Sequence, residues 1–145
     1  MYKKILVPLD GSFRASIAAE QAVQLAKLMN SEVMFLHVIP SISPYVGQYA
    51  GKSEGAYEQI HNDLQNIGEE ILRKAMEDFG SYGVSLDAKK IWGNPAAEIC
   101  REAKEGRYDL IVMSSRGLGE VKGYLMGSTS NRVVRHALCP VLIVR

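Results

Sequence analysis

Residues 110–144 carry the clearest structural signal in the chain and read LIVMSSRGLGEVKGYLMGSTSNRVVRHALCPVLIV. An apolar run, Leu110–Met113, enters a loop of small residues, Ser114–Gly119. Nine residues then separate Gly117 from Gly127–Ser130, which opens an amphipathic segment. Small residues let a ligand approach the backbone closely, and a helix start with hydroxyls and free N–H groups attracts anions. The pattern predicts a cradle for a phosphate chain between a strand and a helix.

The rest of the chain alternates strand-like and helix-like segments. Continuous apolar runs predict strands, and apolar residues that recur every three or four positions predict helices. The predicted strands are Lys3–Leu9, Glu32–Val38, Val84–Trp92, Tyr108–Met113 and Val141–Val144. The predicted helices are Phe13–Met29, Ile60–Phe79, a helix that begins at Asn94-Pro95, and Ser128–Leu138, and Pro40–Gly55 is predicted to be a long loop. Five strands alternating with four helices favour an α/β fold, in which helices cover both faces of a parallel sheet.

Length and charge limit the possible functions of the chain. Its 145 residues fit one domain spanning residues 1–145. Seventeen Lys and Arg residues against 16 Asp and Glu residues leave a net charge of +1, so no overall field attracts nucleic acid or an anionic membrane. No run of 18 apolar residues and no signal-peptide pattern is present. We therefore expect a cytoplasmic protein without a nucleic-acid or membrane partner.

Cysteines and histidines do not indicate a metal or a catalytic thiol. Cys100 and Cys139 lie far apart beside apolar positions, which predicts buried, reduced thiols. His37, His61 and His136 share no zinc-like spacing. Structural or surface roles are expected for all three histidines.

Two loops are placed to share a ligand site. In an open α/β sheet, ligands bind beyond the carboxyl ends of the strands, where the winding order reverses. Asp10-Gly11-Ser12 follows the first predicted strand, and Ser114–Gly119 follows the fourth. If these strands are neighbours, one crevice collects both loops. The alternative is that the glycines are only turn residues.

Three other motifs fail by their spacing or setting. Gly51-Lys52-Ser53 resembles the end of a P-loop, but only three residues separate it from Gly47, where the motif needs four. The glycines at 117, 119 and 123 miss the dinucleotide-binding spacing by one residue. Ser12, His37 and Asp10 could be imagined as a hydrolytic triad, yet no nucleophile elbow surrounds a serine here.

Motifs along nearly the whole chain carry a family resemblance. They are Ile5–Ser12, Val33–Val38, Gly93-Asn94-Pro95, Asp109–Gly117 with its nine-residue spacing to Gly127-Ser128, and Cys139–Val144. In these the chain resembles the ATP-binding branch of the universal stress protein family. The resemblance implies a Rossmann-like, three-layer α/β/α sandwich, similar to adenine nucleotide alpha hydrolases. Its five-stranded parallel sheet would have the order 3-2-1-4-5, which makes the first and fourth strands neighbours.

The resemblance also implies residues for the base and sugar of the nucleotide. Asp10 and the backbone of Val38 would recognise the adenine or ribose side, and Pro8 would wall the pocket. A carboxylate at the end of the first strand can accept hydrogen bonds from ribose hydroxyls or the adenine amino group. The alternative for Asp10 is that it only caps the first helix.

The phosphate side is implied by the small-residue motif. The residues that would line the ribose and phosphates are Met113, Ser114 and Gly117, and those that would hold the phosphate tail are Gly127, Ser128 and Thr129. The chain departs from the family motif at Ser114, where glycine is usual. Serine adds a small side chain that could donate a hydrogen bond or crowd the nucleotide.

The leading interpretation is a regulatory or stress-response protein that holds ATP, with Mg²⁺ or Mn²⁺, without hydrolysing it rapidly. Fast phosphoryl transfer needs cations and a residue that positions the nucleophile, and the cradle offers only Arg116 and Lys122 as candidate cations. The alternatives are a slow ATP hydrolase or nucleotidyl enzyme, and a dimeric interaction module that binds no nucleotide.

The last strand suggests a homodimer. In the implied order, Val141–Val144 lies at the sheet edge as an apolar run without internal charges. Antiparallel pairing with the same strand of a second copy would satisfy its free backbone groups. In the alternative, the loop Pro40–Gly55 covers this edge within a monomer.

Overall fold

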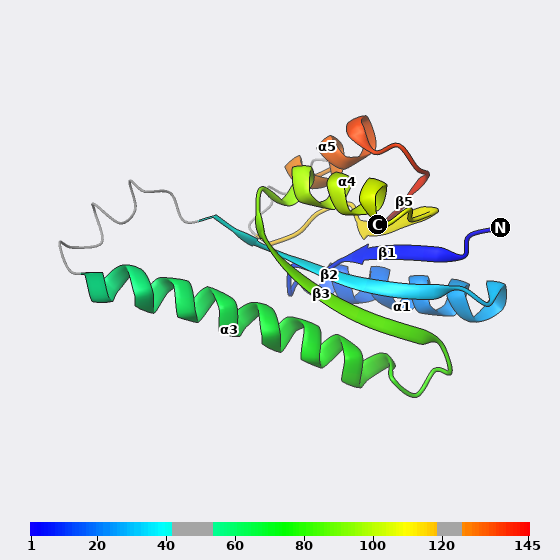
Figure 1. Cartoon of the computed structure of the whole chain (residues 1–145). Helices are drawn as coiled ribbons and strands as arrows, with labels where there is room; N and C mark the ends of the chain where they lie inside the picture. The colour runs from blue at the N-terminus through cyan, green and yellow to red at the C-terminus, as the bar shows by residue number, and fades with distance from the viewer. Residues whose placement is uncertain (42–53, 119–125) are drawn as a thin grey trace.

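The computed structural model describes residues 1–41, 54–118 and 126–145, which form a parallel sheet with helices on both faces (Figure 1). The strands are β1 (Lys4–Pro8), β2 (Glu32–Pro40), β3 (Ser85–Gly93), β4 (Leu110–Ser114) and β5 (Val141–Val144). The helices are α1 (Phe13–Met29), α3 (Glu54–Phe79), α4 (Pro95–Glu105) and α5 (Ser128–His136). The strand order is β3-β2-β1-β4-β5, and every pair is parallel. The predicted fold class and strand order are therefore confirmed.

The sheet separates two apolar cores, because neighbouring residues of a strand point to opposite faces. In β1, Ile5 and Val7 pack in the core under α1 and α3, whereas Leu6 packs in the core under α4 and α5. All three side chains are fully buried. Figure 1 shows the same division, with α1 and α3 on one side of the sheet and α4 and α5 on the other. Burial on both faces explains why β1 is apolar at every central position.

Helix α1 has the predicted bounds because local signals mark both ends. The Ser12 hydroxyl accepts a hydrogen bond from the Ala15 N–H at 3.1 Å, which caps the first turn. Asn30 ends the helix in the left-handed region at φ 55°. Between the caps, the buried stripe consists mostly of alanines, whose short side chains let the helix lie close to the sheet.

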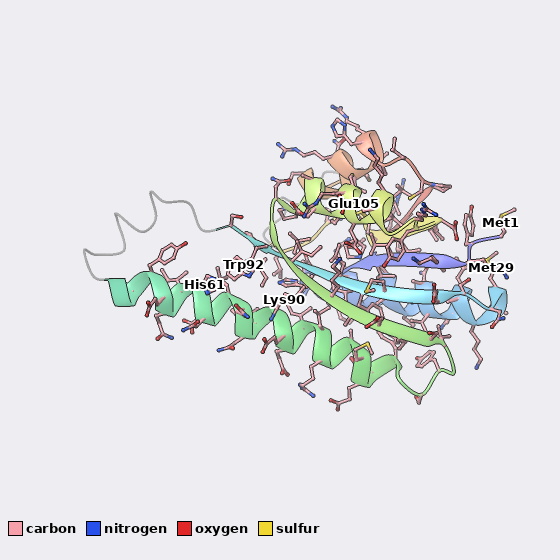
Figure 2. All side chains as sticks on the ribbon, viewed as in Figure 1. Met1, Met29, His61, Lys90, Trp92 and Glu105 are labelled. Atoms are coloured by element: carbon pink, nitrogen blue, oxygen red, sulfur yellow. The ribbon has the colours of Figure 1, made fainter. Side chains whose placement is uncertain are left out.

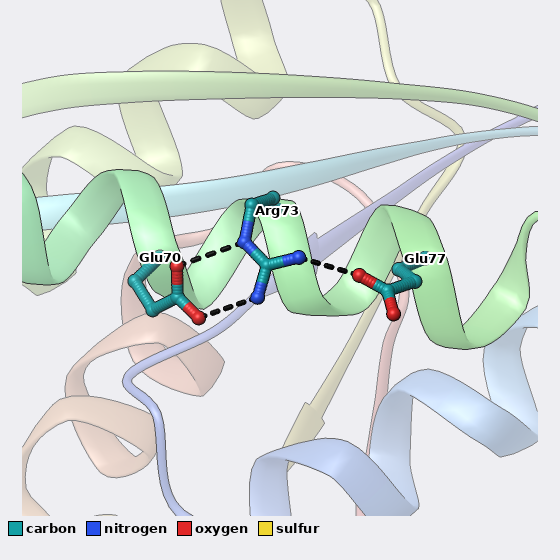
Figure 3. A network of polar contacts seen from close by, with 3 residues as sticks. All are labelled: Glu70, Arg73 and Glu77. Atoms are coloured by element: carbon teal, nitrogen blue, oxygen red, sulfur yellow. Dashed lines mark hydrogen bonds and ion pairs between the residues drawn. The ribbon is translucent and has the colours of Figure 1, made fainter.

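Helix α3 begins earlier than the periodicity predicted, at Glu54 rather than near Ile60. The extra turn contains helix-forming residues and the i,i+4 hydrogen bond from Gln59 to Asp63. On the outer face, Arg73 bridges Glu70 at 2.6 Å and Glu77 at 2.5 Å (Figure 3). Hydrogen bonds to these carboxylates raise the pKa of Arg73, with Glu70 as the larger cause.

Several other boundaries differ from the prediction by one or two residues, among them both ends of β1, which is Lys4–Pro8, and the end of β2, which extends to Pro40. Strand β3 starts at Ser85 and alternates in exposure along its first half, because it is an outer strand of the sheet. Strand β4 starts at Leu110, since the Tyr108 N–H still donates to the carbonyl of Ala103 in α4. Helix α5 ends at His136, and the backbone of the next residue is already extended.

The histidines occupy packing or surface positions, whereas the cysteines are less buried than predicted. His37 is buried, His61 stacks on Trp92 with ring centroids 4.3 Å apart (Figure 2), and His136 is exposed at the end of α5. Cys100 and Cys139 are free and half-buried, and burial raises the pKa of both thiols. Both thiols are therefore protonated at neutral pH and are poor nucleophiles.

No helix in the described ranges is both long and apolar enough to cross a membrane.

Asp109 joins the start of β4 to the start of β1 and makes stability depend on pH. Its Oδ2 atom accepts hydrogen bonds from the backbone N–H groups of Lys3 at 2.8 Å and Lys4 at 2.9 Å. These two bonds hold the pKa of Asp109 below its usual range, and the bond from Lys4 is the larger cause. A lowered folded-state pKa stabilises the fold above the unfolded pKa of about 3.9, and the effect is lost as pH falls through the folded value.

We therefore expect Asp109→Asn to lower the free energy of unfolding at pH 7, because the neutral amide accepts weaker hydrogen bonds. The difference from the wild type should shrink on acidification and vanish near about pH 2. Urea unfolding at several pH values measures this, and Asp78→Asn, at an exposed carboxylate of α3, is the matched control. An equal loss at pH 7 and pH 2 would contradict the assignment.

Candidate functional site

A cavity of about 430 Å³ lies at the carboxyl ends of β1, β2 and β4. Pro8 comes from β1, Leu36 to Pro40 from β2, and Met113 and Ser114 from β4. The neighbouring order of these strands puts their ends at one edge of the sheet, where open α/β folds bind ligands. The volume of the cavity falls within the range of roughly 300–1,000 Å³ usual for small-molecule sites.

Most of the predicted site residues border this cavity. Those that line it are Pro8, Asp10, Val38, Met113, Ser114, Gly117 and Thr129. The other two, Gly127 and Ser128, lie beside Thr129 at the start of α5 but do not line the cavity. Residues 119–125 and 42–53 lie outside the described residues, and with them Lys122, the P-loop-like Gly51-Lys52-Ser53 and most of the predicted long loop.

The Asp10 carboxylate links the loop after β1 to the loop after β4. Its Oδ1 accepts from the Ser12 N–H at 2.9 Å, and its Oδ2 accepts from the Leu118 N–H at 3.0 Å. Ser12, rather than Asp10, provides the side-chain cap of α1. Both carboxylate oxygens keep further lone pairs with which to accept hydrogen bonds from a ligand.

The loop after β4 is held closely against Asp10. A Cβ atom on Gly117 would lie 2.1 Å from Asp10 Oδ2, so a larger residue at this position would require the Asp10 carboxylate to move. The Ser114 hydroxyl donates to the carbonyl of Arg116 at 2.8 Å. The serine that stands in place of the usual glycine therefore braces its own loop.

Helix α5 starts against the same loop with an open first turn. The Gly127 N–H and the Ser130 hydroxyl both donate to the carbonyl of Ser115, at 2.6 Å each. Gly127 is the N-cap and provides no side-chain hydrogen bond, unlike Ser12 of α1 and Asn94 of α4. The first-turn N–H groups of α5 thus remain available to an anion beside Thr129.

Helix α3 forms a wall of the cavity that sequence reasoning did not assign. Leu64, Ile67 and Ile71 project into it from one stripe of the helix. The helix can lie this close because Gly68 has no Cβ atom. A Cβ atom there would lie 2.8 Å from the His37 ring. A glycine inside a helix is unfavourable unless packing requires it, so Gly68 was the signal that could have revealed this wall.

His37 is a second residue of the cavity that sequence reasoning left aside. It is buried, lines the cavity, and its Nδ1 lies 2.7 Å from the carbonyl oxygen of Leu9. A carbonyl only accepts, so Nδ1 donates there. This bond positions the residue before Asp10, and the hydrogen bonds found among the described residues do not join His37 to Ser12.

The charged groups that line the described part of the cavity are few. Asp10 and Arg116 carry opposite charges, and His37 is the other titratable side chain. Within the described ranges, no three His, Cys, Asp or Glu side chains gather where they could hold a metal ion.

Sequence comparison identifies the family. The model of the universal stress protein family matches residues 1–145. The chain belongs to the universal stress protein family. It is 38% identical over 145 residues to a universal stress protein of Methanocaldococcus jannaschii, covering 100% of this chain and 83% of that protein. It is 36% identical over 148 residues to the universal stress protein YxiE of Bacillus subtilis, covering 100% of both.

Solved structures share the fold of this family member. Universal stress protein UspA from Lactobacillus plantarum superposes with a TM-score of 0.84 at 26% identity, covering 99% of this chain and 98% of that one. A universal stress protein in complex with cAMP has a TM-score of 0.75 at 23% identity, covering 99% and 97%. An Arabidopsis thaliana family protein with AMP bound has a TM-score of 0.68 at 22% identity, covering 98% and 90%.

Gly117 and Asp10 should be energetically coupled because of their contact. We expect Gly117→Ala to lower the free energy of unfolding by about 1–3 kcal/mol, the usual effect of overpacking. In an Asp10→Ala background the same change should have little effect, since the clashing oxygen is gone. Urea unfolding of the four proteins of this cycle measures the coupling.

Gly55→Ala is the matched control, because a Cβ atom there has no neighbour within 4 Å in α3. This change should raise stability by about 0.5–1 kcal/mol through helix propensity. Equal losses for Gly117→Ala in both backgrounds would show that the loop does not depend on Asp10.

Proposed function

We propose that this universal stress protein binds an adenine nucleotide in the cavity at the ends of β1, β2 and β4. ATP is the proposed ligand, held with Mg²⁺ or Mn²⁺ in a regulatory, stress-response role in the cytoplasm. Family membership and the two nucleotide-bound proteins of the same fold support the ligand class.

One observation carries the proposal: the cavity joins an apolar compartment to an uncapped helix start. Leu64, Ile67 and Ile71 give apolar surface on one side, suited to a purine ring. The first turn of α5 provides N–H groups and the Thr129 hydroxyl on another side, suited to phosphate oxygens. A nucleotide has both an apolar aromatic end and an anionic end.

The proposed residue roles follow this polarity. Asp10, Pro8 and the backbone of Val38 would contact the base or ribose. The phosphate side would be formed by Met113, Ser114, Gly117, Gly127, Ser128 and Thr129. The divalent ion would be held mainly by the phosphate oxygens, since the described residues offer no cluster of metal ligands.

The nucleotide is proposed to be held rather than turned over rapidly. Rapid phosphoryl transfer needs a residue that orients the nucleophile and several cations on the developing charge. Around the described cavity, the Asp10 carboxylate already accepts two backbone N–H groups, and Arg116 is the one arginine or lysine. These features favour binding over catalysis.

A homodimer through β5 is the second part of the proposal. Strand β5 lies at the sheet edge. The carbonyl of Pro140 accepts a hydrogen bond from the Ile111 N–H, and the carbonyl of Val144 accepts one from the Ser115 N–H. The backbone groups of the intervening Val141 and Ile143 then point to the open side. Leu142 is 41% exposed next to them. Pairing with a second copy would cover both the backbone edge and this side chain.

Nucleotide binding should depend on the start of α5. We expect ATP with Mg²⁺ to bind the wild type in calorimetry and to be recovered intact afterwards. Thr129→Val keeps the shape but removes a hydroxyl, which should weaken binding by about 1.5–3 kcal/mol, roughly 10- to 150-fold. Gly127→Val should block the phosphates and abolish measurable binding.

Leu28→Val, at an exposed position far from the cavity in α1, is the control and should leave the affinity unchanged. ATP affinity within twofold of the wild type for both Thr129→Val and Gly127→Val would refute the phosphate site. Turnover above about 1 s⁻¹ would instead support an enzyme.

Dimerisation should be abolished by a charge on the edge strand. Light scattering is expected to give twice the 16.0 kDa chain mass for the wild type and the single chain mass for Leu142→Lys. Leu28→Lys, 86% exposed on α1, should stay dimeric. A wild-type mass of 16.0 kDa that persists on concentration would rule out the dimer.

A further inference from the structure

Arg116 carries a buried donor that lacks a partner. Among the described residues, its Nε atom is the buried side-chain nitrogen or oxygen with no hydrogen-bond partner. Buried N–H groups are almost always paired in folded proteins, so an orphan donor needs an explanation. Arg73, on the outer face of α3, shows the usual arrangement, with two carboxylates around one guanidinium (Figure 3).

The backbone on both sides of Arg116 is held in place. The Ser114 hydroxyl donates to the Arg116 carbonyl at 2.8 Å, and two residues later the Leu118 N–H donates to Asp10 Oδ2 at 3.0 Å. The intervening Gly117 packs directly on Asp10. The guanidinium therefore stands on a braced loop at the wall of the cavity.

No acidic side chain of the described cavity lining pairs with Arg116, so its charge is available to a ligand. Asp10 is the one carboxylate among the described lining residues, and its two oxygens accept N–H groups of Ser12 and Leu118. In the described part of the chain, Arg116 forms no ion pair with Asp10 or another acid. Thr129, in the open first turn of α5, lines the same cavity. A cation and a helix start thus converge on one space, which suits an anion.

We propose that Arg116 makes the cavity select phosphorylated nucleosides over free nucleosides, by donating its Nε–H to a phosphate oxygen. This assignment rests on the proposed nucleotide site and names the side chain that binds the charged phosphate of the ligand. Arginine suits the role because its planar donors match phosphate geometry, whereas lysine offers a point charge. The base and ribose contacts lie elsewhere, so adenosine keeps them and loses the phosphate contacts, of which the Arg116 bond is one.

Calorimetry with AMP and adenosine tests the assignment, in the absence of divalent ions so that only protein groups meet the phosphate. The wild type should bind AMP at least tenfold more tightly than adenosine. Arg116→Gln should weaken AMP binding at least tenfold and leave adenosine binding within twofold, which lowers the preference for AMP at least fivefold. Arg135→Gln, at an exposed arginine in the last turn of α5, removes the same charge and should change neither affinity.

Two further measurements separate Nε–H donation from general charge and from a structural role. Arg116→Lys keeps the charge but lacks the Nε donor, and should still weaken AMP several-fold. Unliganded Arg116→Gln should unfold within about a degree of the wild type, because the Nε atom has no partner to lose within the described residues. AMP affinity within twofold of the wild type in either Arg116 variant would overturn the assignment.

Failure of the underlying nucleotide site gives a different pattern. If the wild type binds neither AMP nor adenosine, the proposed function fails, and inorganic pyrophosphate becomes the probe of Arg116. If Arg116 binds anions, pyrophosphate should raise the melting temperatures of the wild type and of Arg135→Gln. It should not raise the melting temperature of Arg116→Gln. Equal responses of all three proteins would overturn the role of Arg116.

Discussion

The geometry of the candidate site depends on the Asp10 carboxylate. It stands after β1 and accepts one N–H from Ser12 and another from Leu118, which lies 108 residues further along the chain. Hydrogen bonds to an ionised group are stronger than those between neutral groups. One side chain therefore sets how closely the loops after β1 and β4 approach, and Gly117 is glycine because that approach leaves no room for a Cβ atom.

A second close approach completes the cavity from the other side. Gly68 lets α3 lie against the His37 ring, and His37 in turn bonds the carbonyl of Leu9, the residue before Asp10. The helix thereby brings an apolar stripe over the strand ends, opposite the polar start of α5. The walls formed by α3 and α5 differ in polarity because the two helices contribute different kinds of residue. Helix α3 covers the sheet with apolar residues, whereas α5 begins at a glycine and hydroxyl-rich turn.

Local signals in the sequence were sufficient for much of the fold. The bounds of α1 were predicted from apolar residues at helical spacing, and in the structure Ser12 and Asn30 cap the same ends. The bounds of β5 were predicted because four apolar residues follow Pro140. Errors arose where neighbours in space override local pattern. The start of α3 at Glu54 was missed because apolar residues at helical spacing begin only near Ile60, and β3 alternates in exposure because it lies at the sheet edge. Seven of the nine predicted site residues line the cavity, since strand-end loops of a parallel sheet meet at one edge.

The sequence by itself determined the order of the elements, the family, and the two loops that meet at the ends of β1 and β4. Only the tertiary structure decided that α3 closes the cavity, that Asp10 is bound to both loops, and that the Arg116 Nε atom is left without a partner among the described residues. The physical reason is the distance along the chain between the residues that interact. Capping and periodicity involve residues a few positions apart, so they can be recognised along the chain. Hydrogen bonds and clashes between Asp10, Gly117 and Leu118, or between His37 and Gly68, exist only after the strand crossovers have brought distant segments together.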